Sequence, residues 1–165
     1  MIELYGDNTS NVLKVIIALE ELTLPYRLHH INLMANEQYA PEFEALTPNR
    51  KVPLIVDDEG PGDAPITLWE SGAILIYLGE KANALIPPDP AARYTMLQWL
   101  MFQMASVGPM FGQYNHFKLW VQDQPYSLDR YATQVDRAVG TLEARLAQSA
   151  YLAGAEYSIA DIAVW

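Results

Sequence analysis

The sequence predicts an α/β first half followed by an all-helical second half. Over about the first eighty residues, short β-prone runs alternate with stretches of helical periodicity. A proline-rich segment, residues 84–90, then interrupts both patterns, because proline has no amide N–H and cannot continue a helix or a strand ladder. Beyond it, apolar residues recur at helical spacing. We therefore expect one domain at 1–83 and an all-helical domain at 91–165, joined by this linker.

The first half opens with a predicted strand–helix–strand unit. Residues 2–5 form a short β-prone run that ends at turn residues, and a helix is expected over about 11–22. A second β-prone run covers 26–33, which favours a parallel pair of strands with a right-handed crossover. An amphipathic stretch at 37–46 predicts a further short helix.

Two more β-prone runs, 52–56 and 66–69, lie on either side of a polar turn sequence. Their spacing predicts an antiparallel hairpin. A helix is expected to follow over about 71–81. The order βαβ, a short helix and then ββα is the thioredoxin-like arrangement.

The second half shows two long helical patterns and one capping motif. The apolar residues that mark the two helices are Leu97, Leu100, Met101 and Met104, and then Leu128, Tyr131, Val135, Val139, Leu142 and Leu146. Gly108-Pro109 and Gln124-Pro125 are expected to punctuate them. Ser158 and Asp161 have the spacing of a capping box. Because Trp165 comes about two turns later, we expect this domain to be incomplete and to end inside a helix.

Composition excludes several classes of function. The formal charge of −10 argues against a nucleic-acid partner, which needs clustered Lys and Arg. No apolar run reaches the ~20 residues of a membrane helix, and the N-terminus lacks the pattern of a secretory signal, so a cytoplasmic location and no membrane contact are expected. The sequence has no cysteine, so any sulfur chemistry must use a thiol supplied by a ligand.

Histidine spacing gives no indication of a metal site. His29 and His30 are adjacent in a predicted strand and would point to opposite faces, so they cannot chelate one ion together. His116 has no second His or Cys at ligand spacing. We expect no metal.

Four short motifs carry a family resemblance. They are Thr9-Ser10-Asn11, the segment 48–53 (PNRKVP), the segment 69–74 (WESGAI) and the segment 108–113 (GPMFGQ). With the two-domain layout, they resemble the cytosolic glutathione transferases, and most closely the bacterial nu class of glutathione-dependent disulfide-bond oxidoreductases. The resemblance covers essentially the whole chain. It implies glutathione as co-substrate, either an electrophile or a disulfide as second substrate, and a homodimer.

The segment around Val52-Pro53 has two readings. A cis proline would leave the Val52 backbone groups free to pair with an extended peptide such as glutathione. Alternatively, Pro53 merely begins a strand. The resemblance supports the first reading, because the family places its cis-proline here.

Glu70 and Ser71 stand at the start of a predicted helix. Ser71 alone is typical of a helix N-cap, but a helix N-terminus is also a natural anion site. By resemblance, Ser71 would bind the γ-glutamyl carboxylate of glutathione and Glu70 its ammonium. Both readings of Ser71 can hold together.

Thr9-Ser10-Asn11 lie where the family activates the glutathione sulfur. By themselves they predict only a turn and a helix cap. The resemblance implies that Thr9 and Asn11 donate hydrogen bonds to the thiolate. Ser10 is a rival, and Tyr5 is a weaker one because its place inside a β-prone run suggests core packing.

The remaining candidates each have a structural alternative. By resemblance, Gln38 and Lys51 bind the glycyl carboxylate of glutathione, although each is also compatible with solvated surface. Arg130 resembles a residue that reaches the partner subunit's glutathione, or else it pairs with an acid on its own helix. The aromatic run 114–117 and Trp120 form either a second-substrate pocket or core.

The sequence thus predicts an enzyme that binds glutathione and activates its thiol for conjugation or for thiol–disulfide exchange. The alternative is a non-catalytic glutathione-binding or regulatory module on the same fold, because fold alone does not determine activity.

Overall fold

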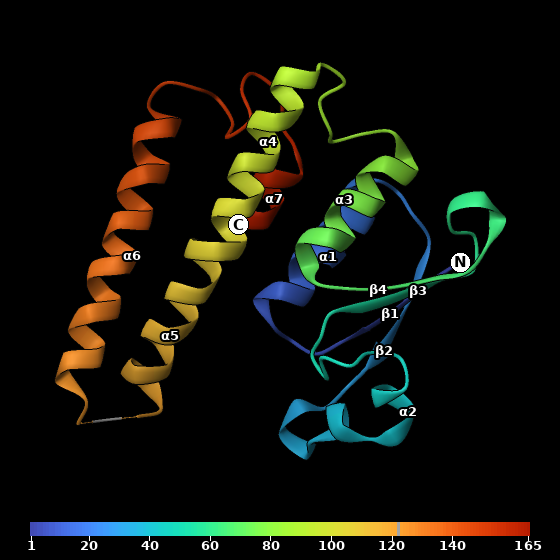
Figure 1. The fold of residues 1–165 in the computed structure, drawn as a ribbon, viewed down its shortest axis with the longest axis horizontal. Helices are drawn as coiled ribbons and strands as arrows, with labels where there is room; N and C mark the ends of the chain where they lie inside the picture. The colour runs from blue at the N-terminus through green and yellow to red at the C-terminus, as the bar shows by residue number, and fades with distance from the viewer. Residues whose placement is uncertain (122) are drawn as a thin grey trace. The chain divides into compact units, whose positions relative to one another are not determined.

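The computed structural model describes residues 1–121 and 123–165, which form a four-stranded sheet with helices and then a set of helices (Figure 1). The chain separates into a first unit, Met1–Ala84, and a second unit, Leu85–Trp165. Each unit has its own buried residues.

The first unit has the predicted βαβαββα order. Its elements are β1 (Ile2–Gly6), α1 (Ser10–Glu21), β2 (Tyr26–His30), α2 (Pro41–Glu44), β3 (Leu54–Asp57), β4 (Ile66–Trp69) and α3 (Ser71–Ala82). The strand order in the sheet is β2-β1-β3-β4. Strand β1 pairs in parallel with β2 and antiparallel with β3, and β3 pairs antiparallel with β4. This mixed sheet confirms the predicted thioredoxin-like fold.

Three expected elements differ in extent. The strand expected at 26–33 ends at His30, because Asn32 caps a 3₁₀ turn at Leu33–Ala35. Proline explains the other two differences. The strand expected at 52–56 begins at Leu54 instead, because Pro53 has no N–H for the ladder; the Val52–Pro53 bond is cis. The helix expected over 37–46 is split into a 3₁₀ turn, Glu37–Tyr39, and the short helix α2, whose first residue is Pro41. Proline is suited to the first turn of a helix but cannot lie within its hydrogen-bonded interior.

Side chains of β1 alternate between the two faces of the sheet. Ile2, Leu4 and Gly6 are buried on the face covered by α1, where Gly6 lies so close to Val12 that an added Cβ would come within 2.5 Å of it. Helices α1 and α3 lie on this side of the sheet, and α2 lies on the other (Figure 1). On the second face, the Tyr5 ring lies 6.3 Å from that of Phe43 in α2.

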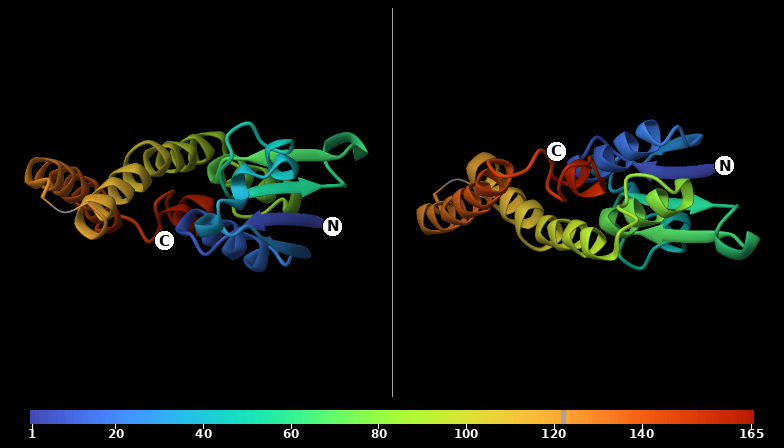
Figure 2. Two further views of the ribbon diagram at one scale, coloured as in Figure 1. Left: turned by 90° about the horizontal axis from the view of Figure 1, so that it is seen from below. Right: turned by 90° about the horizontal axis from the view of Figure 1, so that it is seen from above.

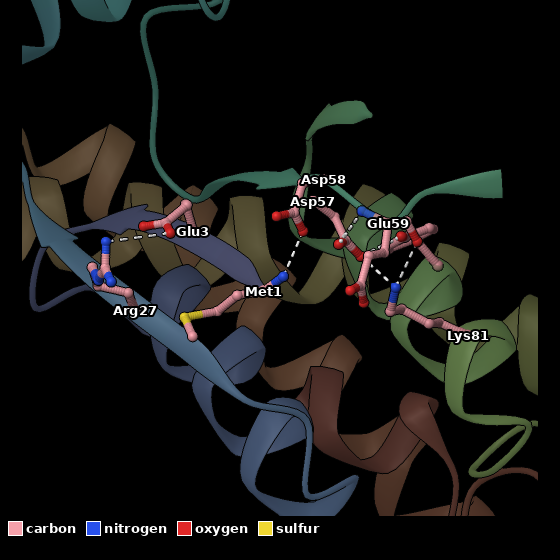
Figure 3. Close-up of polar contacts among 8 residues, drawn as sticks. Met1, Glu3, Arg27, Asp57, Asp58, Glu59 and Lys81 are labelled. Carbon is pink, nitrogen blue, oxygen red and sulfur yellow. Dashed lines mark hydrogen bonds and ion pairs between the residues drawn. The ribbon is translucent and has the colours of Figure 1, made fainter. Parts of the chain in front are cut away.

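A polar cluster joins β3 to α3 at the end of the sheet shown in Figure 3. The buried Asp57 forms an ion pair with Lys81, with Oδ2 and Nζ 2.8 Å apart, and it accepts a hydrogen bond of 2.5 Å from the Tyr77 hydroxyl. The backbone N–H of Glu59 donates to the other carboxylate oxygen at 3.0 Å. These contacts connect the edge hairpin to the helix that covers it.

The second unit contains the remaining helices. They are α4 (Pro90–Phe102), a π-helical turn (Gln103–Val107), α5 (Gly108–Leu119), α6 (Pro125–Leu146) and α7 (Ile159–Val164). Helices α5 and α6 pack side by side in all views (Figures 1 and 2). Buried residues of α4, such as Met96 and Leu100, belong to the same core as Ile159 and Ile162 of α7.

At Gly108-Pro109 the helical hydrogen-bond pattern changes, but no loop separates the helices. The π-helical turn leads directly into α5, and the Gly108 N–H bonds to the Gln103 carbonyl, five residues earlier. Pro109 has no N–H, so the regular i→i−4 pattern cannot continue through it.

The capping box predicted at Ser158 is present. The Asp161 carboxylate accepts hydrogen bonds from the Ser158 N–H and hydroxyl, and also from the Leu152 N–H at 2.8 Å. Across the described residues, we found no helix with the length and apolarity needed to cross a membrane.

Candidate functional site

A cavity of about 500 Å³ lies in the first unit, at the N-terminal end of α1. Its lining residues are Thr9, Asn11, Leu33, Gln38, Tyr39, Pro48, Asn49, Arg50, Lys51 and Val52. The volume is that of a typical small-ligand pocket. The fold thus gathers five predicted site residues from three separate segments: Thr9, Asn11, Gln38, Lys51 and Val52.

Thr9 and Asn11 reach the cavity from the start of α1. Thr9 is the N-cap, and its Oγ1 accepts the Val12 N–H at 3.3 Å. A hydroxyl that accepts a hydrogen bond still has its own proton to donate. The Asn11 Oδ1 accepts a hydrogen bond of 2.8 Å from Lys14 Nζ, which leaves the Asn11 amide N–H groups to donate.

Ser10 and Tyr5, the two rival candidates for sulfur activation, lie outside the cavity lining. Ser10 is exposed, and Tyr5 is stacked on His29 with ring centroids 4.6 Å apart. Within the described chain, neither residue contributes to the lining of the cavity. His29 also contacts Glu3, whereas His30 contacts Asp7 at 3.1 Å, so the two adjacent histidines have separate partners.

Lys14 contacts Asn11, a residue of the cavity lining, and sequence reasoning missed this lysine. Only 4% of it is exposed, and burial lowers the pKa of its ammonium to about 8. The sequence did contain a signal, because Lys14 is a charged residue within the otherwise apolar run of α1, three positions after Asn11. A buried charge at that spacing needs a polar partner from the preceding turn.

The segment 48–52 supplies backbone groups and positive charge. Among the described residues, the Val52 N–H and C=O have no backbone hydrogen-bond partner. Lys51 is exposed and forms no ion pair with another described residue, whereas Arg50 pairs with Glu44 at 2.5 Å. Lys51 is therefore available to an anionic ligand.

Gln38 has a buried side-chain oxygen with no partner among the described residues. A buried polar atom is normally hydrogen-bonded, so an orphaned one beside a cavity points to a ligand or a water. Gln38 thus matches a polar ligand in the same cavity as Lys51.

Neither Glu70 nor Ser71 is among the described residues that line this cavity, but Glu70 contacts one that does. The Asn49 amide donates to Glu70 Oε1 at 3.3 Å, and Asn49 itself lines the cavity. Glu70 is the residue before α3 and has a φ of 75°, in the left-handed region. Ser71 is the first residue of α3 and is buried, so the Ser71 hydroxyl lies at a helix N-terminus.

Asp7 holds the loop that carries Leu33 against the cavity. Its carboxylate accepts the Leu33 N–H at 3.0 Å and the Asn8 N–H at 2.7 Å. These two backbone hydrogen bonds, with a smaller contribution from His30, lower the pKa of Asp7. Asp7 therefore stays ionised at neutral pH and links the end of β1 to the cavity rim.

Arg130 is in α6 of the second unit. It lines a separate cavity of about 330 Å³ with Tyr126, Asp129, Thr133, Gln134 and Arg137. Arg130 forms no ion pair with any described residue.

In the run 114–117 of α5, Tyr114 and Phe117 are half-buried, and Asn115 and His116 are exposed. Phe117 stacks on Tyr131 of α6, with ring centroids 5.6 Å apart, which places it in the packing between α5 and α6. Trp120 is 76% exposed. Over the described ranges, no cluster of three or more metal-ligating side chains is present.

Two family models match the chain. The glutathione S-transferase N-terminal domain matches residues 10–81, and the glutathione S-transferase C-terminal domain matches residues 125–165. The disulfide-bond oxidoreductase YfcG of Escherichia coli is 43% identical, over 100% of this chain and 78% of its own length. The chain spans 64% of the length of three other curated relatives.

Solved structures of similar proteins contain glutathione. A glutathione transferase family member from Pseudomonas fluorescens, with two glutathione bound, is 45% identical with a TM-score of 0.95, and the match covers 98% of this chain and 73% of that one. A glutathione transferase from Pseudomonas putida, with one glutathione disulfide bound per subunit, is 44% identical with a TM-score of 0.95, covering 99% and 72%.

Proposed function

Because both domain models and a 43% identical relative match it, the chain belongs to the glutathione transferase family, and we propose that it uses glutathione to reduce disulfides. The observation that carries this proposal is the cavity of the first unit, where two hydrogen-bond donors at a helix start face a site with a free cation. The chain contains no cysteine, so glutathione supplies the nucleophile.

Glutathione fits the polar groups around the cavity. Lys51 and the side-chain amide N–H groups of Gln38 donate to the glycyl carboxylate, and the free Val52 backbone groups pair with the cysteinyl residue. Glu70 pairs with the γ-glutamyl ammonium. The γ-glutamyl carboxylate binds at the N-terminus of α3, beside Ser71, where backbone N–H groups and the helix dipole favour an anion.

Thr9 and Asn11 activate the thiol. A free thiol has a pKa of ~8.5, so little thiolate is present at neutral pH. Lowering that pKa by roughly 2 units requires ~2.7 kcal/mol of preferential thiolate stabilisation. A hydroxyl donor, an amide donor and the N-terminus of α1 together can supply this energy.

The reaction then proceeds by thiol–disulfide exchange. The glutathione thiolate attacks one sulfur of the substrate disulfide, and the other sulfur leaves as a thiolate that takes up a proton. The thiolate of a second glutathione attacks the mixed disulfide, releasing glutathione disulfide and the second substrate thiol. The Pseudomonas structures hold two glutathione or one glutathione disulfide, which correspond to the two reductants consumed by the overall reaction and to its oxidised product.

The finer assignments belong to the same proposal. We place the chain in the nu class, in the cytoplasm and in a homodimer, in which Arg130 reaches the glutathione of the partner subunit. The first domain, 1–83, holds glutathione, and the helical domain, 91–165, contributes to the second-substrate site.

A paired assay tests this function. Thiol–disulfide exchange and conjugation to a model electrophile are measured side by side on the wild type, Thr9→Ala and Ser10→Ala. We expect the rate of disulfide exchange to exceed the rate of conjugation in the wild type. Thr9→Ala should lower the exchange rate by up to about 10²-fold, and Ser10→Ala should leave it near the wild-type value. Conjugation without exchange would reassign the chain as a conjugating transferase, and glutathione binding with neither activity would indicate a non-catalytic module. Full activity of Thr9→Ala with loss in Ser10→Ala would replace the nu-class mechanism by a serine-type one.

A further inference from the structure

Lys14 contacts the side chain that the proposed mechanism uses as an amide donor. Its Nζ lies 2.8 Å from Asn11 Oδ1, one turn earlier on α1. Asn11 is exposed to the cavity, whereas Lys14 is 4% exposed and lies behind it. The lysine therefore cannot serve as a general surface charge.

An ammonium has only donors, and this decides the orientation of the amide. A side-chain amide can rotate by 180°, which exchanges its acceptor oxygen for its donor nitrogen. If Asn11 were rotated, its NH₂ group would face the three N–H donors of Lys14, and both groups would lose this partly buried hydrogen bond. The ammonium thus holds the Asn11 oxygen inward and keeps the NH₂ group for a ligand.

We infer that Lys14 is a positioning residue, which fixes the Asn11 amide so that its N–H donors face the sulfur of glutathione. This inference rests on the proposed function, because it assigns a role within the same site. Burial alone gives Lys14 a pKa of about 8, so the ammonium form still predominates at pH 7.

Thr9 is also held with its donor toward the cavity, but by a backbone group rather than by a side chain. The acceptor position of the Thr9 hydroxyl is occupied by the Val12 N–H, a backbone group that any sequence supplies. The acceptor position of Asn11 is occupied by a side chain, so one substitution removes it. Both donors are then oriented toward the cavity by contacts made within α1.

A double-mutant cycle on Lys14 and Asn11 tests the inference. The pKa of the bound glutathione thiol is measured from the ultraviolet absorbance of its thiolate, together with kcat and KM for disulfide exchange. We expect Lys14→Met to raise this thiol pKa by about one unit and to lower kcat about 10-fold, with KM changed little. In an Asn11→Ala background the same substitution should change kcat by less than about 2-fold.

Two further variants separate positioning from folding. Lys14→Arg keeps a donor-only side chain and is expected to restore most of the lost activity. Lys81→Met is the matched control, because it also removes a lysine ammonium in the first unit, where Lys81 pairs with the Asp57 carboxylate and donates to the Glu59 carbonyl. Lys81→Met should lower stability but leave the thiol pKa unchanged.

A measurement on the wild type does not depend on any variant folding. Nuclear Overhauser contacts are expected from the Asn11 amide protons to the cysteinyl methylene of bound glutathione. Amide protons directed at Lys14 instead would overturn the inference, as would equal effects of Lys14→Met in both backgrounds. A wild type that binds glutathione without lowering its thiol pKa would overturn the proposed function and this inference with it. A lowered thiol pKa that Lys14→Met leaves unchanged would overturn the inference alone.

Discussion

Asp57 of β3 and Lys81 of α3 form an ion pair in which the carboxylate is almost fully enclosed. The side chains are 1% and 23% exposed, and Oδ2 and Nζ lie 2.8 Å apart. Tyr77 donates to the same oxygen, which raises the pKa of the tyrosine through burial and through this hydrogen bond. The cluster connects the β3–β4 hairpin, which leads to Glu70, with the helix that follows it.

Removing the charge of Asp57 should destabilise the first unit. Asp57→Asn keeps the size of the side chain but leaves the Lys81 ammonium without its negative partner, so we expect a loss of about 1–3 kcal/mol in the free energy of unfolding. Urea denaturation measures it. Asp58→Asn is the matched control, because Asp58 is exposed and its ion-pair partner among the described residues is the ammonium of Met1. Equal stability of the two variants would contradict the role assigned to the buried pair.

The lowered pKa of Asp57 also predicts how the free energy of unfolding depends on pH. Burial acts to raise the pKa of Asp57, but Lys81, Tyr77 and the Glu59 N–H outweigh it, and the net pKa is lowered. Below the unfolded pKa of ~3.9, the unfolded state therefore binds more protons than the folded state. The stabilisation is complete above about pH 4 and is lost as the pH falls through the folded pKa. Denaturation midpoints between pH 2 and 6 should show a smaller loss for Asp57→Asn than for the wild type.

Two glycines should respond in opposite directions to alanine. Gly6 has Val12 within 2.5 Å of the position of an added Cβ, so Gly6→Ala forces β1 and α1 apart and should cost about 1–3 kcal/mol. Gly140 lies inside α6 with open space around it, so Gly140→Ala should stabilise by about 0.5–1 kcal/mol. Thermal unfolding measures both, and destabilisation by Gly140→Ala would be the contrary result.

The assignment of Glu70 to the γ-glutamyl ammonium predicts a selective loss of affinity. Glu70→Gln should weaken glutathione binding about 10-fold, because an exposed carboxylate–ammonium contact is lost while the Asn49 contact can be kept. The analogue glutaryl-Cys-Gly lacks that ammonium and should bind the wild type and Glu70→Gln with similar affinity. Isothermal titration calorimetry measures the affinity of each of the two proteins for each of the two ligands. An equal loss for both ligands would assign Glu70 a purely structural role.

The order of elements in the first unit could be predicted because local patterns specify it. The β-prone runs and the helical periodicity of 11–22 depend on neighbouring residues only, and the resulting strands and α1 lie within a few residues of their expected places. The failure at 37–46 has a local cause that the amphipathic pattern concealed, because Pro41 divides the segment. Apolar spacing reports which face is buried, and it does not report whether the backbone hydrogen bonds continue.

The site was only partly predictable for a different reason. The motif residues Thr9, Asn11, Lys51 and Val52 were found because their chemistry matched a known pattern, and the fold brings them to one cavity. The contact between Lys14 and Asn11 depends on the side-chain direction at one turn of α1. The sequence alone cannot predict such a contact, because the spacing i, i+3 permits a hydrogen bond without requiring it.

The Asp161 carboxylate joins three points of the second unit that would otherwise move independently. It binds the Leu152 and Ser158 N–H groups and the Ser158 hydroxyl, and so closes the loop between α6 and α7 onto the start of α7. Opening of this loop must then release the first turn of α7, so the two segments should form one cooperative unit of local unfolding. Their amide protons should exchange with solvent at a shared rate, although Leu152 and Asp161 are nine positions apart in sequence.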